Sequence, residues 1–208
     1  MNAPARGDLF IVSSPSGGGK STLIRRLLAN PPGEPLHFSI SHTTRAMRKG
    51  EENGREYHFV TTEAFQKMVQ RDEFLEHNEV HGQIYGTSHA EVLPHLAAGE
   101  DVVLDIDVQG ARDVRGAYPG AIAIFIVPSS PQVLERRLVR RGLDGEESVR
   151  KRLINAAREV QQAEEFQYVI VNDDLDRATL ELESVVRARR LTPARQAARL
   201  VRIRKEFH

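Results

Sequence analysis

A chain of 208 residues is long enough for one or two small domains with a sizeable hydrophobic core. Its 29 Lys and Arg residues balance its 29 Asp and Glu residues, so the overall charge gives no reason to expect nucleic acid or a membrane surface as a partner. The chain has no cysteine, which excludes disulfides and thiolate metal sites, and we see no signal peptide and no apolar run of about 20 residues, so we expect a soluble cytoplasmic protein.

A glycine-rich turn follows the first predicted strand. Residues 10–12 are apolar, residues 17–19 are all glycine, and apolar side chains recur at helical spacing from Lys20 onward. Glycines let backbone N–H groups surround an anion, and the N-terminus of a helix adds its positive dipole. The stretch predicts a phosphate-binding loop, with Lys20 at the terminal phosphates of a nucleotide and Ser21 as a ligand of Mg²⁺. Ser14 replaces the first glycine of the usual motif, but a chance glycine-rich turn would not explain the Lys-Ser-Thr that follows.

A different texture begins after a turn rich in proline. Residues 37–60 are polar and rich in β-formers, and Asn53 and Gly54 stand between two arms as they do in a hairpin. Apolar spacing predicts a short helix after Thr62 and a second extended piece over residues 74–80. We therefore expect residues 37–87 to form a small β-rich domain that is inserted into the chain.

The texture of a parallel sheet resumes after this insertion. Ser88 and Glu91 fit a capping box at the start of a helix that Gly99 ends. Residues 102–104 and 121–127 are continuous apolar runs, which are typical of strands covered on both faces. Strands and helices then alternate to the end of the chain, so the sequence predicts a doubly wound α/β core with a parallel sheet.

The division of the chain follows from this alternation. Residues 1–36 and 88–208 form the expected core, which includes a helical lid at about 130–150. The last part, about residues 187–208, holds eight basic residues and one acidic residue and leaves a net charge of −7 for the rest. We interpret it as a solvated helical extension, with contact to a second subunit as the alternative.

Two carboxylates follow the predicted buried strand at residues 102–104. In open parallel sheets the carboxyl ends of the strands face the ligand crevice, which is also the edge that carries the phosphate loop. Asp105 is therefore placed to hold Mg²⁺, directly or through water. Asp107 could cap the following helix, and this role does not exclude a second one in binding.

Four further segments, together with the phosphate loop, carry a resemblance to a known family. They are residues 41–48 (SHTTRAMR), 53–57 (NGREY), 104–110 (LDIDVQG) and 169–174 (VIVNDD). In this order, over about residues 8–186, the chain resembles guanylate kinases of the bacterial type. The resemblance implies a P-loop core, an inserted GMP-binding domain and a lid. It also implies Mg²⁺-assisted in-line transfer of the terminal phosphoryl group of ATP to GMP, and to dGMP, as the domains close.

The resemblance further implies which residues bind ATP and stabilise its transferring phosphate. The ATP-binding residues are Ser16, Gly17, Gly18, Gly19, Lys20, Ser21, Thr22 and Asn172. Three arginines match the lid arginines that close over the ATP phosphates: Arg137, Arg141 and Arg152. Together with Lys20 and Arg45 they form the implied catalytic set, and we expect the linkers at about 33–36 and 86–99 to act as hinges.

A second group of residues is implied to bind GMP. Its phosphate is gripped by Arg45, Arg48, Tyr57 and Tyr85, and its base is read by Ser41, Glu76, Thr87 and Asp107. Guanidinium groups bind phosphate in a bidentate manner. Carboxylates accept hydrogen bonds from N1–H and N2–H₂ of guanine, whereas adenine has an acceptor at N1 and would be rejected.

Two other functions stay open on the sequence alone. A binding module could keep the guanylate kinase fold without catalysis, although such modules typically have a degraded phosphate loop. A kinase for another nucleoside monophosphate would not need the carboxylates of Glu76 and Asp107. We expect the small molecules ATP and GMP as partners, no nucleic acid and no membrane, and a homo-oligomer only if the C-terminal extension forms a subunit contact.

Overall fold

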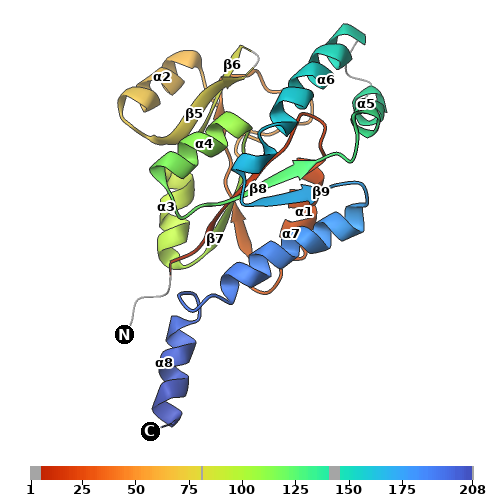
Figure 1. The fold of residues 1–208 in the computed structure, drawn as a ribbon. Coiled ribbons are helices and arrows are strands. Elements are labelled where there is room, and N and C mark those ends of the chain that lie inside the picture. The colour runs from red at the N-terminus through yellow and green to blue at the C-terminus, as the bar shows by residue number, and fades with distance from the viewer. Residues whose placement is uncertain (1–5, 81, 141–145, 208) are drawn as a thin grey trace.

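The computed structural model describes residues 6–80, 82–140 and 146–207. Among these residues, five strands form a parallel sheet at the centre of the larger part of the molecule (Figure 1). In spatial order they are β2 (Leu36–Phe38), β7 (Asp101–Asp105), β1 (Leu9–Ser13), β8 (Ile122–Val127) and β9 (Tyr168–Val171). All neighbouring pairs run parallel, which confirms the predicted doubly wound α/β core.

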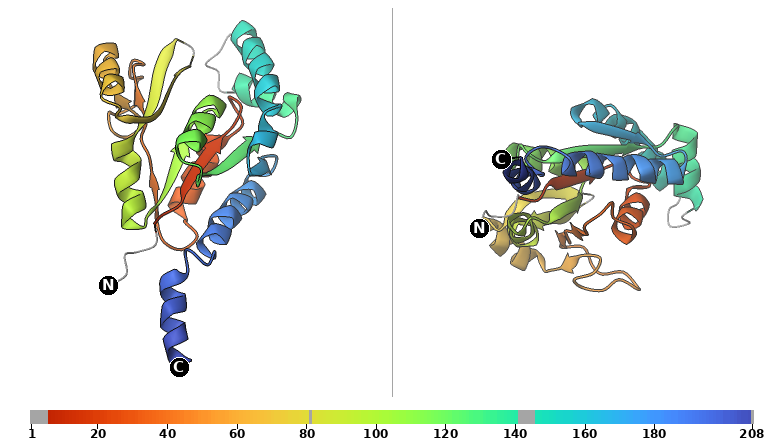
Figure 2. Two further views of the ribbon diagram at one scale, coloured as in Figure 1. Left: turned by 60° about the vertical axis from the view of Figure 1, so that its left-hand side comes forward. Right: turned by 90° about the horizontal axis from the view of Figure 1, so that it is seen from below.

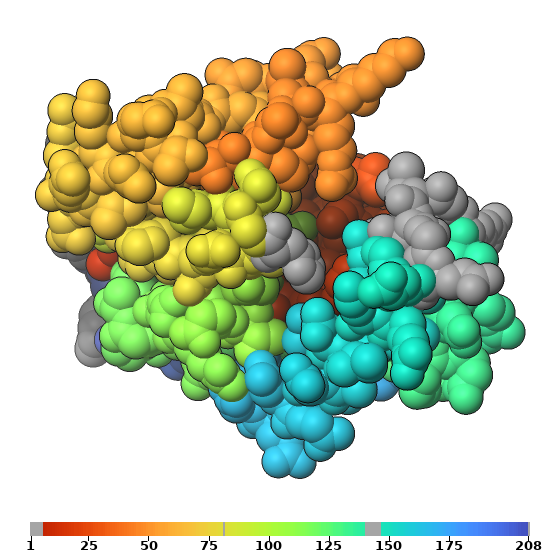
Figure 3. All heavy atoms as spheres, turned by 90° about the horizontal axis from the view of Figure 1, so that it is seen from above, coloured from red at the N-terminus to blue at the C-terminus, as the bar shows by residue number. Residues whose placement is uncertain are grey.

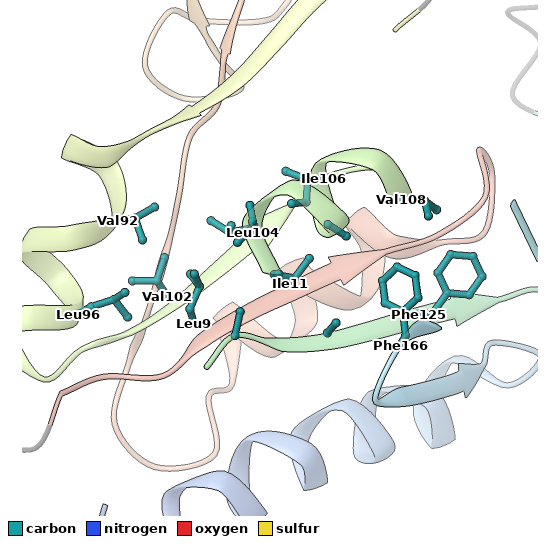
Figure 4. Close-up of a cluster of buried hydrophobic side chains, with 14 residues drawn as sticks. Leu9, Ile11, Val92, Leu96, Val102, Leu104, Ile106, Val108, Phe125 and Phe166 are labelled. Carbon is teal, nitrogen blue, oxygen red and sulfur yellow. The ribbon is translucent and has the colours of Figure 1, made fainter. Parts of the chain in front are cut away.

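Helices cover both faces of this sheet. They are α1 (Lys20–Ala29), α3 (His89–Ala98), α4 (Val108–Ala117) and α7 (Leu175–Arg190). Helices α5 (Pro131–Arg140) and α6 (Glu146–Val160) pack against each other in a separate cluster, and a short 3₁₀ turn, η1 (Ala163–Glu165), follows α6. Side chains alternate along β1, so Leu9 and Ile11 pack in the cluster with α3 and α4 (Figure 4), whereas Phe10 and Val12 pack in the cluster with α1 and α7. Because both faces of β1 are buried, its sequence is apolar throughout.

A second sheet lies beside the core. Its order is β4 (His58–Phe59), β3 (His42–Thr43), β6 (Gln83–Ser88) and β5 (Phe74–Val80), and it is accompanied by α2 (Thr62–Gln70). The expected hairpin around Asn53 and Gly54 is wrong, because β3 and β4 pair in parallel. The Asn53 side chain instead accepts a hydrogen bond from the Phe59 N–H at 2.8 Å, which closes a local loop within the connection.

The chain crosses between the two sheets at two places. Strand β2 pairs with β7 of the core, so His37 and Phe38 lie in the larger sheet, although the sequence predicts that the insertion begins at residue 37. Residues 39–41 then lead to β3, and β6 ends at Ser88, directly before α3. Figure 2 shows the second sheet and α2 standing to one side of the core.

The two ends of helix α3 differ in how well the sequence predicts them. Gly99 ends the helix in the left-handed conformation at φ +88°, as predicted. Ser88 is the N-cap residue, but its side chain makes no capping hydrogen bond. The capping box is therefore wrong, because the Glu91 carboxylate binds the N–H of Ile40 and the ring of His58 instead.

The basic C-terminal extension consists of two different parts. Arg190 and Arg195 bind Asp101 at the start of β7, and Arg189 binds Asp8 next to β1. Helix α8 (Ala197–Glu206) projects away from the rest of the molecule (Figure 1), and none of its ten described residues is buried. Nowhere in the described residues is a helix both long and apolar enough to cross a membrane.

Removing the Asp101 carboxylate should destabilise the fold. Its side chain is fully buried and accepts hydrogen bonds from Arg190 Nε at 2.7 Å, Arg195 at 2.9 Å and the Asp8 N–H at 2.8 Å. Asp101→Ala removes the carboxylate that two largely buried guanidinium groups share, so we expect the free energy of unfolding to fall by about 3–5 kcal/mol. Urea denaturation measures this loss.

The matched control is Asp176→Ala, which removes the aspartate of an exposed ion pair with Arg26. The Asp176 side chain is 84% exposed where it meets Arg26. Water screens such a pair, so its removal should change stability far less. Equal losses in the two variants would contradict the structural role of Asp101.

Candidate active site

The loop between β1 and α1 has the geometry of an anion-binding turn. Gly17 and Gly19 have φ values of +91° and +98°, which non-glycine residues rarely adopt. A Cβ atom at Gly19 would lie 2.2 Å from Nδ2 of Asn172, so glycine is also required for the close approach of these two segments. Among the described residues only Asp72 combines a positive φ with a side chain, so Ser14 has an ordinary backbone conformation and does not require glycine.

Lys20, Ser21 and Asp105 form one hydrogen-bonded group at the end of β7. Nζ of Lys20 lies 2.6 Å from Oδ1 of Asp105 and also donates to the Ile106 carbonyl at 2.9 Å. The Ser21 hydroxyl donates to the other oxygen of Asp105 at 3.2 Å. The expected Mg²⁺ ligands are therefore brought together with the phosphate-loop lysine.

The donor atoms at this place suit Mg²⁺. A carboxylate and a hydroxyl are hard oxygen ligands, and Mg²⁺ commonly takes one or two protein ligands and fills its shell with phosphate oxygens and water. Within the described residues, no group of three or more His, Asp or Glu side chains could hold a metal without such help. The Asp105 side chain is 24% exposed, so it is accessible to a metal that arrives with a nucleotide.

Arg137 and Asn172 hold the other side of the loop. The Arg137 guanidinium donates to the carbonyls of Gly18 at 3.2 Å and Asn172 at 2.7 Å, and the Asn172 amide donates to Gly18 at 2.9 Å. Burial lowers the pKa of Arg137, although arginine stays charged at physiological pH. A cavity of about 300 Å³ opens here, and its lining residues are Gly17, Gly19, Thr22, Arg137, Asn172, Asp173 and Leu175.

A larger cavity of about 870 Å³ lies between the second sheet and α6, and Figure 3 shows the hollow from above. Arg152 of α6 lines it opposite Arg45, Arg48 and Tyr85. The structure thus places Arg152 across from the predicted GMP phosphate site, whereas Arg137 lines the smaller cavity near the loop. Arg141 lies outside the described residues.

Aromatic rings and a carboxylate position Arg45. Its guanidinium carbon lies 5.4 Å from the ring centroid of Tyr57, and the rings of Tyr57 and Tyr85 are 5.7 Å apart. Burial, with a smaller effect from nearby Asp105, raises the pKa of Tyr57 to about 12, so its hydroxyl remains a donor.

Glu51 is a residue of this group that sequence reasoning missed. It accepts hydrogen bonds from the Arg45 side chain and the Arg48 backbone N–H, both at 2.8 Å, and these bonds lower the pKa of Glu51. Its signal in the sequence is slight, because it is one of two adjacent glutamates in a polar loop.

Three of the four predicted guanine readers, Glu76, Thr87 and Asp107, meet at the N-terminus of α4. The Thr87 hydroxyl donates to the Glu76 carboxylate at 2.7 Å. A Cβ atom at Gly110 would lie 2.9 Å from Oε2 of Glu76 and 3.3 Å from Oδ1 of Asp107, so both carboxylates adjoin this helix start. Asp107 also caps α4 by accepting the Gly110 N–H at 2.8 Å, which confirms that interpretation.

Burial raises the pKa of Glu76 to about 6, although hydrogen bonds from Thr87 and Asn78 oppose the shift. Asn78 was missed by sequence reasoning, and it donates to Glu76 at 3.4 Å and to Asp113 of α4 at 2.8 Å. Ser41 lies in the crossing segment 39–41, immediately before β3, and its carbonyl accepts the His58 N–H at 2.9 Å.

Comparison with known proteins gives a consistent result. The family model of guanylate kinase matches residues 6–189. The chain is 50% identical over 193 residues to the guanylate kinase of Dechloromonas aromatica (strain RCB), covering 93% of this chain and 95% of that protein. It is 49% identical over 195 residues to the guanylate kinase of Escherichia coli (strain K12), covering 94% of each. The crystal structure of guanylate kinase from Anaplasma phagocytophilum superimposes with a TM-score of 0.75 at 32% identity, covering 93% and 91% of the two chains.

The loop geometry predicts that Gly19→Ala destabilises the protein more than an alanine substitution at a glycine that has the same backbone conformation but open space around it. The added Cβ would both force an alanine into a positive φ and displace the Asn172 amide, which holds the Gly18 carbonyl. We expect a loss of about 2–3 kcal/mol in the free energy of unfolding without nucleotide, because left-handed backbone costs about 1–2 kcal/mol and the broken hydrogen bond adds about 1 kcal/mol.

Gly50→Ala is the matched control for this prediction. Gly50 has a similar φ of +89°, but nothing lies within 4 Å of the place that an added Cβ atom would take. Its substitution should therefore show the backbone penalty alone. If urea denaturation gave the same loss for both variants, the contact with Asn172 would not matter.

Proposed function

The chain belongs to the guanylate kinase family, and from that premise we propose that it transfers the terminal phosphoryl group of ATP to GMP, giving ADP and GDP. The observation that best supports this function is the pair of aspartates at the carboxyl end of β7. Asp105 joins Lys20 and Ser21, whereas Asp107, two residues later, adjoins Glu76 beside Thr87. One strand end thus connects a phosphate-binding group with a group suited to read guanine.

ATP is proposed to bind at the phosphate loop. Backbone N–H groups of residues 16–19 surround the phosphates, and Lys20 neutralises their terminal oxygens. Ser21 and Asp105, the latter directly or through water, would hold Mg²⁺, and the metal would neutralise negative charge on the phosphates. Asn172 would lie near the bound nucleotide, because its amide donates to the Gly18 carbonyl of the loop.

GMP is proposed to bind across the larger cavity. Arg45, Arg48, Tyr57 and Tyr85 would hold its phosphate through charge-assisted hydrogen bonds. At the other end, Ser41, Glu76, Thr87 and Asp107 would pair with the edge of guanine. Buried polar groups reject a base that leaves them unpaired, so this end selects guanine over adenine. Nothing in this set requires a ribose 2′-hydroxyl, and we therefore include dGMP as an acceptor.

Catalysis in this proposal consists of positioning and charge neutralisation. The attacking oxygen of GMP and the leaving oxygen of ADP must lie in line at the transferring phosphorus, and arginines that reach the equatorial oxygens stabilise their charge. Arg137, Arg141 and Arg152 would supply these contacts as the second sheet and the lid close over the substrates. Closure also excludes water that would hydrolyse ATP. Assembly of a homo-oligomer through α8 stays a prediction.

A coupled assay that offers ATP with GMP, dGMP, AMP, dTMP or no acceptor tests the function. We expect turnover with GMP and dGMP, and Lys20→Ala should lower kcat/KM by about 10²- to 10³-fold, because it removes a charge that stabilises the transferring phosphate. Lys67→Ala, on the exposed face of α2, is the control and should match the wild type. Turnover on AMP equal to that on GMP would contradict guanine reading, and no turnover with any acceptor would indicate a binding module.

The affinity for GMP should fall at acid pH because Glu76 must be ionised to accept hydrogen bonds from guanine. The pKa of Glu76 is raised to about 6, so the carboxylate is ionised above pH 7 and becomes protonated as the pH falls through 6. At pH 5 about nine tenths of the side chains would be protonated, and we expect KM for GMP to rise by about tenfold from this cause.

The phosphate of GMP itself titrates near pH 6, so the wild-type profile alone would mix two effects. Glu76→Gln supplies the baseline, because it keeps the phosphate titration and removes that of the carboxylate. We expect the ratio of KM values, variant to wild type, to be about tenfold smaller at pH 5 than at pH 7.5. A ratio that is independent of pH would exclude titration of Glu76.

A further inference from the structure

The two crossings between the sheets lie beside one carboxylate. Residues 39–41 lead from β2 of the core to β3 of the second sheet, and the chain returns through Ser88 into α3. Glu91 stands in the first turn of α3, and its Oε2 accepts the N–H of Ile40 in the outgoing segment at 3.2 Å. The Glu91 side chain therefore connects segment 39–41, which leaves the core, to helix α3, where the chain returns to the core.

Glu91 also contacts the second sheet directly. Its Oε1 lies 3.0 Å from Nε2 of His58, which belongs to β4. Partial burial opposes ionisation of Glu91, but the hydrogen bonds from His58 and the Ile40 N–H outweigh it and hold the pKa of Glu91 below its usual range. A carboxylate can accept several hydrogen bonds at once, so the charged form serves both segments.

Imidazole rings surround this carboxylate on the core side and on the second sheet. His37 of β2 stacks on His95 of α3 with ring centroids 3.4 Å apart, and its Nε2 lies 3.6 Å from Glu91, too far for a hydrogen bond. His42 of β3 lies 4.6 Å from the ring of His58. The contacts of Glu91 thus lie among imidazole rings that come from the core and from the second sheet.

We propose that Glu91 is a positioning residue that fixes the orientation of the second sheet relative to the core before GMP binds. The proposal rests on the proposed function, because segment 39–41 contains Ser41 and leads, through β3, to Arg45. If this segment is free to shift, Ser41 and Arg45 move away from the positions in which they would contact GMP. When fewer molecules are competent to bind, the apparent affinity falls in proportion to the competent fraction.

The kinetic test compares the effect of a Glu91 substitution on KM for GMP with its effect on KM for ATP. Glu91→Ala removes the acceptor of both hydrogen bonds, and we expect KM for GMP to rise by about three- to tenfold, whereas KM for ATP stays within about twofold, because the phosphate loop lies on the core. Glu91→Gln keeps an acceptor for the Ile40 N–H, and its amide can bond to the other tautomer of His58, so it should restore most of the affinity. If KM for ATP rose in parallel with KM for GMP, the proposal would be overturned.

Two further variants sharpen the comparison. Glu100→Ala is the matched control, since Glu100 pairs with His95 at 2.5 Å near the end of α3 and binds neither crossing segment. His58→Phe keeps a ring against His42 and removes the hydrogen bond to Glu91. Its effect on KM for GMP should be smaller than that of Glu91→Ala, and the double variant should be no worse than Glu91→Ala alone. Full additivity would show that the two residues act separately and would overturn the proposal.

A distance measurement tests the orientation without reference to activity. The chain has no cysteine, so Gln66→Cys on α2 and Ala188→Cys on α7 provide two unique sites for spin labels, both exposed. We expect a narrow distribution of label distances with Glu91 and a broader one in Glu91→Ala, with GMP narrowing both. Unchanged distances in Glu91→Ala would overturn the proposal even if KM had risen. If the wild type failed to use GMP, the proposed function would be wrong, whereas the distance distributions would still decide the role of Glu91.

Discussion

The parallel arrangement of five buried strands is the constraint on which the rest of the molecule depends. Strands β1, β7, β8 and β9 all end at the same edge of the sheet, so polar residues that follow them are gathered there. Lys20, Asp105 and Asn172 come from three such connections and meet around the phosphate loop. No pair of them is close in the sequence, and the topology alone brings them together.

The two ends of β7 show how position in the sheet decides what a carboxylate does. Asp101, at the amino end, is fully buried and paired with Arg190 and Arg195, so it serves the fold. Asp105, at the carboxyl end, is partly exposed and paired with Lys20 in the group proposed to meet the nucleotide. The same residue type is structural at one edge and available for chemistry at the other, because only one edge carries the ligand crevice.

Local signals were predicted well and long-range ones less so. Gly19 lies directly before α1 and Gly99 ends α3, as expected. Both residues have the left-handed backbone conformation, which is a local requirement that glycine meets easily. Asn53 and Gly54 failed as a hairpin because the pairing of β3 is decided by distant strands. Glu91 failed as a capping residue for a similar reason, as its partners lie far away in the sequence. Lys20, Ser21 and Asp105 were predicted from local motifs, whereas the GMP-binding residues came from family resemblance. Glu51 and Asn78 act through neighbours that no motif in the sequence marks.

The predicted guanine site itself spans the two parts of the molecule. Glu76 and Thr87 belong to the second sheet, Asp107 belongs to the core helix α4, and Asn78 reaches across to Asp113 of the same helix. The second sheet is therefore held to the core at the base-reading end, while Arg45 and Arg48 line the open cavity that faces α6. A rotation about the held end moves these arginines farther than it moves Glu76. We therefore expect the base to be read before the phosphate is enclosed.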